Sequence, residues 1–349
     1  MHGAMQAIVK TEAGPGLTLI DVPVPEIGPG DVLIRIQKTS ICGTDVHIYE
    51  WDDWASKTIH APQTIGHEFA GVVEKVGRDV SEVCVGDLVS GEGHIVCGHC
   101  RNCRAGRRHL CQTPNAIGVN RDGAFAEFLS MPSSNVWRVD PTISPEVLSL
   151  FDPLGNAVHA ALSWDLLGED VLITGAGPIG IMSVIVARHA GARHVVITDL
   201  NAYRLSLAEA CDATIALDID AGTIAEAQQA LGMIEGFDVG LEMSGNPRAV
   251  NDMMANMTHG GKISLLGIQN RAATVNWDDV IFKGLNIKGI YGREMYETWY
   301  KMTALIQSGL DISPLITHRL HYTEYEKAFE VMASGESGKV ILDWTEPVK

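Results

Sequence analysis

The chain has 349 residues, 46% of them hydrophobic and 20% charged, with a formal net charge of −17 at pH 7. The chain is longer than a typical domain with a single hydrophobic core, so two domains are expected. The excess of acidic residues argues against binding to nucleic acids or to anionic membrane surfaces, because both bind basic patches on proteins. No apolar run is long enough to span a membrane and no secretory leader is recognisable, which predicts a cytoplasmic protein.

Short β-branched runs separated by glycine and proline dominate residues 1–150. They predict strands at 6–10, 18–22, 31–38, 70–76 and 88–91. No sustained helical periodicity is visible in this part of the chain. A mostly β domain built as a barrel is therefore expected.

The pattern changes after Pro153, where strands and helices begin to alternate. Apolar strands are expected at 171–174, 195–199, 239–243, 263–266 and 287–291, with helices at 157–167, 180–190 and 202–211. Strands buried on both faces and separated by helices predict a doubly wound parallel sheet. A helix at 296–308 and a last strand at 339–344 complete the chain.

A glycine fingerprint directly follows the first of these apolar strands. Gly175, Gly177 and Gly180 have the spacing that permits a tight turn, close approach to a pyrophosphate and close helix packing. Asp199 ends the next strand, where an acid accepts hydrogen bonds from the adenosine ribose and repels a 2′-phosphate. NAD is therefore expected rather than NADP. Arg204, on the following helix, is either a ribose or adenine contact or a surface residue.

Four cysteines lie close together in the chain. Cys97, Cys100, Cys103 and Cys111 supply enough thiolates to close a tetrahedral shell, which predicts a structural zinc. An iron–sulfur cluster is the rival interpretation. Ferredoxin motifs continue with x3-Cys-Pro, whereas here seven residues separate the last two cysteines and Gln112 follows. Disulfides are disfavoured by the expected reducing compartment.

Three residues are candidate ligands of a second, catalytic zinc. Cys42, His67 and Glu68 offer a sulfur, a nitrogen and an oxygen, and a catalytic zinc uses three protein groups and leaves one position open. Adjacent ligands cannot point the same way on a regular strand. Either the flanking Gly66 and Gly71 bend the backbone, or Glu68 is an outer or exchanging ligand.

Asp152 starts the segment expected to join the two domains. An acid there is either a zinc ligand or a group that orients His67 or a bound water. The structural alternative is an acid at a helix N-terminus, because Pro153 suits the first position of a helix.

Four motifs, in this order, resemble those of the zinc-dependent medium-chain dehydrogenases: Cys42-Gly43-Thr44-Asp45, Gly66-His67-Glu68, the four-cysteine segment and the glycine fingerprint. The resemblance covers nearly the whole chain. The longer stretches 41–49, 91–103, 151–159 and 289–295 are closest to the members that act on L-threonine.

The resemblance implies an α/β fold in three parts. A mostly-β GroES-like catalytic domain is expected at 5–156, with a structural zinc lobe at 97–111. A doubly wound Rossmann domain is expected at 157–295. A C-terminal segment at 296–349 is expected to return to the catalytic domain.

The resemblance also implies roles for matching positions. Cys42, His67 and Glu68 would hold the catalytic zinc, Thr44 and His47 would form a proton relay that Asp152 assists without being a permanent ligand, and His94 would belong to the substrate pocket. The structural zinc would be held by Cys97, Cys100, Cys103 and Cys111. The NAD site would be lined by Gly175, Gly177, Ile179, Gly180, Asp199, Arg204, Leu266, Gly267, Ile268, Ile290 and Tyr291.

The implied activity is oxidation of the β-hydroxyl of L-threonine with NAD, by a homotetramer with two zinc ions per chain. Candidate partners for the substrate ammonium and carboxylate are Glu92, Asn156, Arg293 and Glu294. A polyol or alcohol dehydrogenase of the same superfamily stays open, because its zinc and NAD chemistry would be identical. A non-catalytic zinc-binding interaction module is the alternative from another class, and it would leave Cys42, His67 and the glycine fingerprint unexplained.

Overall fold

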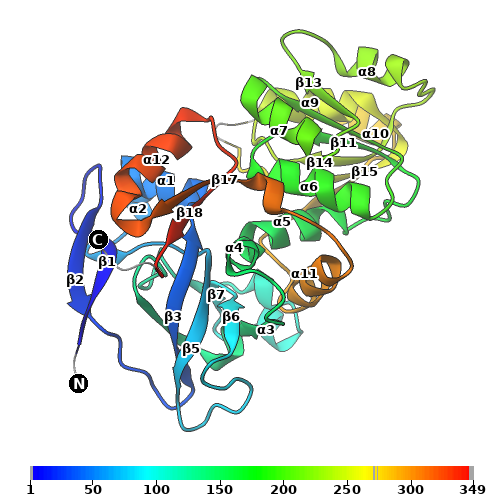
Figure 1. The fold of residues 1–349 in the computed structure, drawn as a ribbon. Helices are drawn as coiled ribbons and strands as arrows, with labels where there is room; N and C mark the ends of the chain where they lie inside the picture. The colour runs from blue at the N-terminus through cyan, green and yellow to red at the C-terminus, as the bar shows by residue number, and fades with distance from the viewer. Residues whose placement is uncertain (1–2, 270–271, 273, 346–349) are drawn as a thin grey trace. The chain divides into compact units, whose positions relative to one another are not determined.

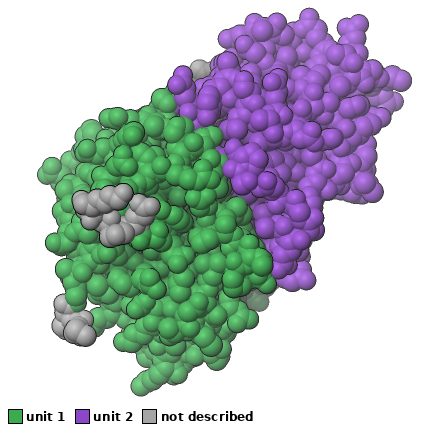
Figure 2. All heavy atoms as spheres, in the orientation of Figure 1, with its two compact units in different colours: residues 1–152, 316–334, 339–349 green, residues 153–315, 335–338 purple. Residues whose placement is uncertain are grey.

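Two compact units make up the chain. The computed structural model describes residues 3–269, 272 and 274–345. Among these, unit 1 comprises residues 3–152, 316–334 and 339–345, and unit 2 comprises the rest (Figure 2). No helix in the described part of the chain has the length and apolar character needed to cross a membrane.

Unit 1 consists mainly of strands, as its sequence predicts (Figure 1). One sheet has the order β2–β1–β4, a second the order β10–β6–β5–β3–β18–β17 with β9 also paired to β3, and a third is the pair β7–β8. The strands are β1 (Ala4–Lys10), β2 (Thr18–Pro23), β3 (Asp31–Ser40), β4 (Gln63–Thr64), β5 (Phe69–Val76), β6 (Leu88–Gly91), β7 (His94–Ile95), β8 (Asn115–Ala116), β9 (Phe128–Pro132), β10 (Val136–Arg138), β17 (Ile316–His321) and β18 (Lys339–Asp343). The expected barrel is therefore not one closed sheet, because the described strands are divided among three.

Unit 1 also contains helices that the sequence pattern did not predict. These are α1 (Gly43–Glu50), α2 (Asp53–Thr58), α3 (Arg101–Arg104), α4 (Pro145–Ser149) and α12 (Tyr325–Ser334). Most are short, and local caps define their ends. The Asp52 carboxylate accepts the backbone N–H groups of Trp54 and Ala55 at the start of α2, which satisfies donors that have no partner within the helix.

The C-terminal part of the chain completes unit 1. Strand β18 pairs antiparallel with β3 and parallel with β17, so a segment from the end of the chain lies within the main sheet. Helix α12 packs on α1, where Tyr49 and Phe329 stack with ring centroids 4.8 Å apart. The core formed here includes the fully buried Ile34, Phe69 and Phe125.

Unit 2 is a six-stranded parallel sheet in the order β13–β12–β11–β14–β15–β16. Its strands are β11 (Asp170–Thr174), β12 (His194–Asp199), β13 (Ile215–Asp218), β14 (Phe237–Glu242), β15 (Met257–Leu265) and β16 (Asn286–Gly289). Its helices are α5 (Phe151–Ala161), which begins two residues earlier in unit 1, α6 (Pro178–His189), α7 (Ala202–Ala210), α8 (Ile224–Ala230), α9 (Pro247–Asn256), α10 (Trp277–Phe282) and α11 (Glu297–Gln307). The strand order reverses beside β11, and this is where a doubly wound sheet binds dinucleotides. The predicted fold class is confirmed.

One expected helix is displaced. The sequence predicts a helix at 157–167, whereas α5 runs from Phe151 to Ala161. Pro153 is accommodated in its first turn, where a missing N–H group costs nothing because that group has no partner within the helix. Asp152 therefore lies at the start of the helix and is buried.

Asp170, at the start of β11, is expected to stabilise unit 2 in a pH-dependent way. Its buried carboxylate pairs with Arg193 and His194, and although burial opposes the charge, these partners hold the pKa of Asp170 below its usual range. Replacing Asp170 with Asn should lower the free energy of unfolding near pH 7 by about 1–2 kcal/mol, since Arg193 is itself largely exposed.

This contribution is present above the unfolded-state pKa of about 4 and is lost as the pH falls through the lower folded-state value. Urea unfolding of both proteins near pH 7 and near pH 3 measures the difference. An equal difference at both pH values would contradict the assignment.

Candidate active site

The first candidate ligand lies where β3 passes into α1. Cys42 precedes the first turn of α1, and its backbone N–H donates to Asp45 Oδ2 over 2.9 Å. This hydrogen bond fixes the turn. The Thr44 hydroxyl lies 3.8 Å from Cys42 Sγ, so one short segment presents a thiol and a hydroxyl side by side.

His67 and Glu68 precede β5, in irregular backbone rather than in a strand. Gly66 has φ +91°, and a Cβ there would lie 2.1 Å from Phe125 Cδ1. Only glycine fits this left-handed, crowded position. The bend allows adjacent side chains to reach one centre, because ligand atoms of Cys42, His67 and Glu68 all lie within 4.8 Å of one another.

Buried polar atoms at this centre fit a metal ion. His67 Nδ1, Glu68 Oε1 and Asp45 Oδ1 are buried and have no hydrogen-bond partner among the described residues. Burial opposes a charge on His67, but Asp45 and Cys42 outweigh it and hold the pKa of the imidazole well above its usual value. A donor set of thiolate, imidazole and carboxylate that favours a nearby positive charge suits Zn²⁺.

Asp45 is a residue whose role at the centre was missed. Its side chain is fully buried, and Oδ1 lies 3.6 Å from His67 Nδ1. A carboxylate beside the ring nitrogen of a ligand fixes the tautomer and orientation of the imidazole. In the sequence Asp45 stands out only as part of the Cys42–Asp45 motif, and its other carboxylate oxygen accepts the hydrogen bond from Cys42.

The sequence also did not indicate the role of Lys339 at this centre. Its Nζ donates to Glu68 Oε2 and, over 2.8 Å, to the carbonyl of Ile41, and all three groups are buried. The Ser40 hydroxyl donates to the same Glu68 oxygen. Glu68 Oε2 is thus hydrogen-bonded to Lys339 and Ser40. Glu68 Oε1 remains available as a ligand atom.

The two expected relay residues lie on α1. Thr44 is beside Cys42, and His47 is half-exposed, with Nδ1 2.8 Å from Asp52 Oδ2. Asp52, which the sequence did not single out, holds the imidazole in place. A histidine that reaches solvent is suited to passing a proton outward.

Asp152 and His94 belong to the same unit. A Cβ on Gly93 would lie 3.9 Å from both Asp152 Oδ2 and His67 Cβ, so Asp152 is near the cluster and contributes to the raised pKa of His67. His94 Nδ1 lies 3.0 Å from Oε1 of the fully buried Glu92. Glu92 therefore orients His94 and is engaged within its own segment.

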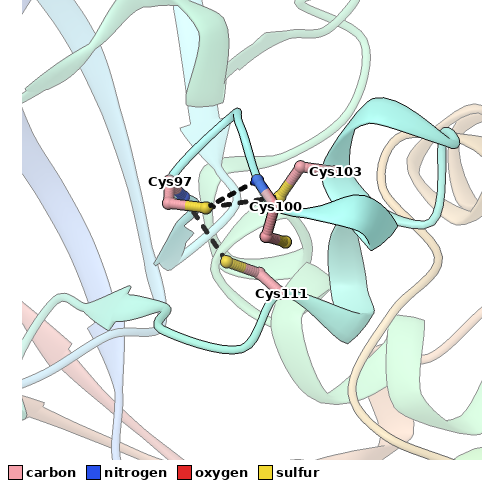
Figure 3. Close-up of side chains that lie close together, drawn as sticks. All are labelled: Cys97, Cys100, Cys103 and Cys111. Carbon is pink, nitrogen blue, oxygen red and sulfur yellow. Dashed lines mark hydrogen bonds between the residues drawn. The ribbon is translucent and has the colours of Figure 1, made fainter.

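Four cysteines converge in a separate loop (Figure 3). The Sγ atoms of Cys97, Cys100, Cys103 and Cys111 lie within 4.8 Å of one another, and two of them, those of Cys97 and Cys103, are 4.0 Å apart. Tetrahedral zinc with Zn–S bonds near 2.3 Å needs sulfurs about 3.8 Å apart. Backbone N–H groups of Cys103 and Gln112 lower the pKa of Cys100 to about 6, which favours its thiolate form. The loop fits a structural zinc.

The glycine fingerprint has the geometry of a phosphate-binding turn. Gly175 has φ +93°, and a Cβ there would lie 2.8 Å from Ser244 Cα. A Cβ on Gly180 would lie 1.9 Å from the Gly175 carbonyl, so α6 packs directly on the turn. Gly177 caps α6 and faces open space, which leaves the helix N-terminus accessible to an anion.

The remaining expected cofactor residues lie at the carboxyl edge of the same sheet. The Asp199 carboxylate accepts the N–H of Ala176, over 2.6 Å, and those of Leu200 and Asn201. Arg204 follows on α7. Ile179 is in the first turn of α6, residues Leu266, Gly267 and Ile268 follow β15, and Ile290 and Tyr291 follow β16. The positions that the sequence indicated for the cofactor therefore lie at or next to this edge.

Two further residues border this edge. A hollow of about 100 Å³ beside the end of β12 is lined by Leu200, Ile219 and Arg248, among others. Ile219 follows β13, and Arg248 is in the first turn of α9. No local pattern could have indicated them.

The substrate-binding candidates in unit 2 lie around the start of α5 and the segment after β16. Arg293 is buried, with Nη1 3.4 Å from Asn156 Oδ1, and its stem fills the space over Gly155. Glu294 Oε1 lies 3.5 Å from His159 Nε2. Asn156, Arg293 and Glu294 therefore all contact other side chains of unit 2.

Comparisons with known proteins give the same picture over the whole chain. Residues 28–141 match the model of the alcohol dehydrogenase GroES-like domain, and residues 178–308 match that of the zinc-binding dehydrogenases. L-threonine 3-dehydrogenase of Solibacter usitatus is 62% identical over 97% of this chain and all of the relative, and that of Chromobacterium violaceum is 60% identical over the same shares.

Solved structures agree. A zinc-binding dehydrogenase of Sinorhizobium meliloti 1021 bound to NADP superposes with a TM-score of 0.90 at 28% identity, covering 98% of this chain and 99% of that one. An alcohol dehydrogenase of Thermus sp. ATN1 gives 0.88 at 28% identity, covering 97% and 99%.

Proposed function

Because this chain belongs to the zinc-dependent medium-chain dehydrogenases, and within them to the L-threonine 3-dehydrogenase family, we propose that it oxidises the β-hydroxyl of L-threonine with NAD, giving 2-amino-3-ketobutyrate and NADH. Identity of about 60% over the full length of L-threonine 3-dehydrogenases carries this proposal. The predicted enzyme class, with a nicotinamide cofactor and zinc, is confirmed.

In this proposal each residue of the centre has one task. Cys42, His67 and Glu68 would hold zinc, and a zinc ion bound there would polarise the substrate hydroxyl and lower its pKa. Asp45 orients His67. The buried Glu68 Oε1 without a hydrogen-bond partner among the described residues, and the close approach of the three donor atoms, support this ligand set. The four cysteines of the loop at 97–111 hold a second zinc that stabilises the fold.

The proton of the substrate hydroxyl leaves through Thr44 and is delivered to solvent by His47, with Asp152 assisting near His67. Residues at the carboxyl edge of the parallel sheet would hold NAD, which would supply the hydride acceptor. The contact between Thr44 and Cys42 and the exposed position of His47 support this route.

Replacing His47 with Asn should lower kcat about a hundredfold, because the last proton acceptor of the relay is removed. The zinc content should stay unchanged. The measurement is steady-state turnover with L-threonine between about pH 6 and pH 9. His60→Asn is the matched control, since His60 is exposed on the same unit. Unchanged turnover of His47→Asn across this range would remove His47 from the relay.

NAD, rather than NADP, is proposed as the cofactor. The carboxylate of Asp199 lies at the end of β12 and is held there by three backbone N–H groups, which fixes a negative charge where a 2′-phosphate would lie. We expect kcat/KM for NAD to exceed that for NADP by at least about tenfold. Equal values would show that Arg204 dominates at this position.

The nearest competing function is a polyol or alcohol dehydrogenase. An amino-acid substrate needs partners for an ammonium and a carboxylate, and Glu92, Asn156, Arg293 and Glu294 remain the candidates. Steady-state rates with L-threonine, sorbitol and ethanol separate the functions. Threonine should give the highest kcat/KM, and equal rates for all three would contradict the assignment.

The competing interpretation as a non-catalytic zinc-binding interaction module is tested by metal content. Two zinc ions per chain are expected, one for each ligand cluster. A chain that retained about one zinc after purification in zinc-containing buffer would support a structural site alone.

A homotetramer is proposed from the family and from the surface of unit 2. Strand β16 is the last strand of its sheet, and its outer edge is unpaired among the described residues. Trp277, Ile281 and Phe282 of the neighbouring α10 are exposed. An open strand edge beside exposed apolar side chains suits pairing with a second copy. Sedimentation should give four times the 37.6 kDa chain mass.

The proposed location is the cytoplasm. The seven cysteines, all of them within the described residues, form no disulfide. Zinc-binding thiols persist in a reducing compartment, where disulfides are rare.

A further inference from the structure

Glu242 is a fully buried carboxyl group that no step above uses. It is the last residue of β14, next to β11 at the centre of the sheet, where the strand order reverses. Its register partner on β11 is Thr174, the residue just before Gly175. Glu242 therefore lies directly beside the glycine fingerprint.

One oxygen of this carboxyl group organises the following turn. Glu242 Oε1 accepts the backbone N–H of Ser244 over 2.8 Å, the N–H of Gly245 over 3.0 Å, and the hydroxyl of Ser244. The hydroxyl of Thr174 approaches the same oxygen at 3.5 Å. A single acceptor thus fixes both residues of the turn after β14.

The turn at Ser244 and Gly245 contacts the turn after β11 on one side and the turn after β15 on the other. Ser244 is the residue that a Cβ on Gly175 would strike. On the other side, a Cβ on Gly245 would lie 2.2 Å from the Ile268 carbonyl, and one on Gly267 would lie 2.3 Å from Gly245 N. These contacts allow no space for the turn to shift without moving its neighbours.

The backbone of Glu242 makes a second connection. Its carbonyl accepts the N–H groups of Leu266 and Gly267, each over 3.0 Å. The carboxyl and carbonyl groups of one residue therefore hold the turns after β14 and β15, and the first of these contacts the turn after β11. We propose that Glu242 is a positioning residue that sets these three turns in the arrangement that receives the dinucleotide.

The other carboxyl oxygen indicates which substitution to use. Glu242 Oε2 is buried without a hydrogen-bond partner among the described residues, and burial raises the pKa of the group, although the Ser244 and Gly245 donors oppose this. Glutamine keeps the Oε1 acceptor and has the shape of the neutral acid. Alanine removes the acceptor and leaves the turn N–H groups buried without a partner.

This proposal rests on the proposed nicotinamide cofactor but not on L-threonine as the substrate. Its test therefore measures the Kd for NADH by cofactor fluorescence without substrate. Glu242→Ala should weaken NADH binding about 10- to 100-fold, and Glu242→Gln should stay within about threefold of the parent. If the parent protein failed to bind NADH, the proposed function would fail instead.

Val239→Ala is the matched control for stability, because Val239 is equally buried on the same strand. It should lower Tm without changing the Kd for NADH. If Glu242→Ala does not fold, Glu242→Asp replaces it: the shorter side chain withdraws the acceptor, and NADH binding should weaken at least about fivefold. Proportional changes of Kd and Tm in all variants, or unchanged NADH binding in Glu242→Ala or Glu242→Asp, would overturn the proposal.

Discussion

Replacing Cys42 with Ala is expected to lower kcat/KM for L-threonine at least about a thousandfold, because the metal supplies several kcal/mol of transition-state stabilisation. The zinc content should fall from about two atoms per chain to about one, since the four-cysteine loop is a separate site. Metal analysis and steady-state kinetics on the same preparation measure both effects.

Cys84→Ala is the control for this substitution. Cys84 is an exposed thiol in the same unit, and it belongs to neither ligand cluster among the described residues. It should leave activity and both zinc ions unchanged. A Cys42→Ala protein that kept its second zinc and its turnover would show that the centre does not use this thiolate.

Replacing Lys339 with Met is expected to cost about 3–5 kcal/mol of unfolding free energy, because the carboxylate of Glu68 would stay buried without its cation. Lys339 and Glu68 are both almost completely inaccessible to solvent, so water cannot screen the loss. Denaturant unfolding of the zinc-free protein measures the effect, because zinc bound at Glu68 would itself compensate the charge of this carboxylate.

The double variant Glu68→Gln with Lys339→Met should recover much of this loss, since no charge is then left unpaired. Lys57→Met is the exposed control: its pair with Asp53 lies on the surface and should contribute little or nothing. A Lys339→Met protein as stable as this control would mean that the buried pair is not a stabilising element.

Features encoded by neighbouring residues could be predicted from the sequence. The turn at Gly175–Gly180 follows a short apolar strand and opens a helix, so the pattern contains both the fold and the phosphate site. The four cysteines lie within one loop, and their spacing alone indicates a metal. The bend at Gly66 was one of the two alternatives that the sequence left open for His67 and Glu68.

Features that depend on contacts between residues distant in the sequence could not be predicted. Lys339 contacts Glu68 across 271 positions of sequence, and a lysine on an expected strand gives no sign of a buried partner. The pairing of Asp45 with His67 likewise depends on how α1 and the segment before β5 meet. The short helices α1 and α2 were missed because their caps, rather than any apolar periodicity, define them.

Following NADH formation from L-threonine and NAD, before and after removal of zinc with a chelator, tests the proposed activity most directly. We expect one NADH per 2-amino-3-ketobutyrate formed, loss of the rate on chelation, and its return when zinc is added back. A rate with threonine no higher than with sorbitol or ethanol, or a rate that survives complete loss of zinc, would contradict it.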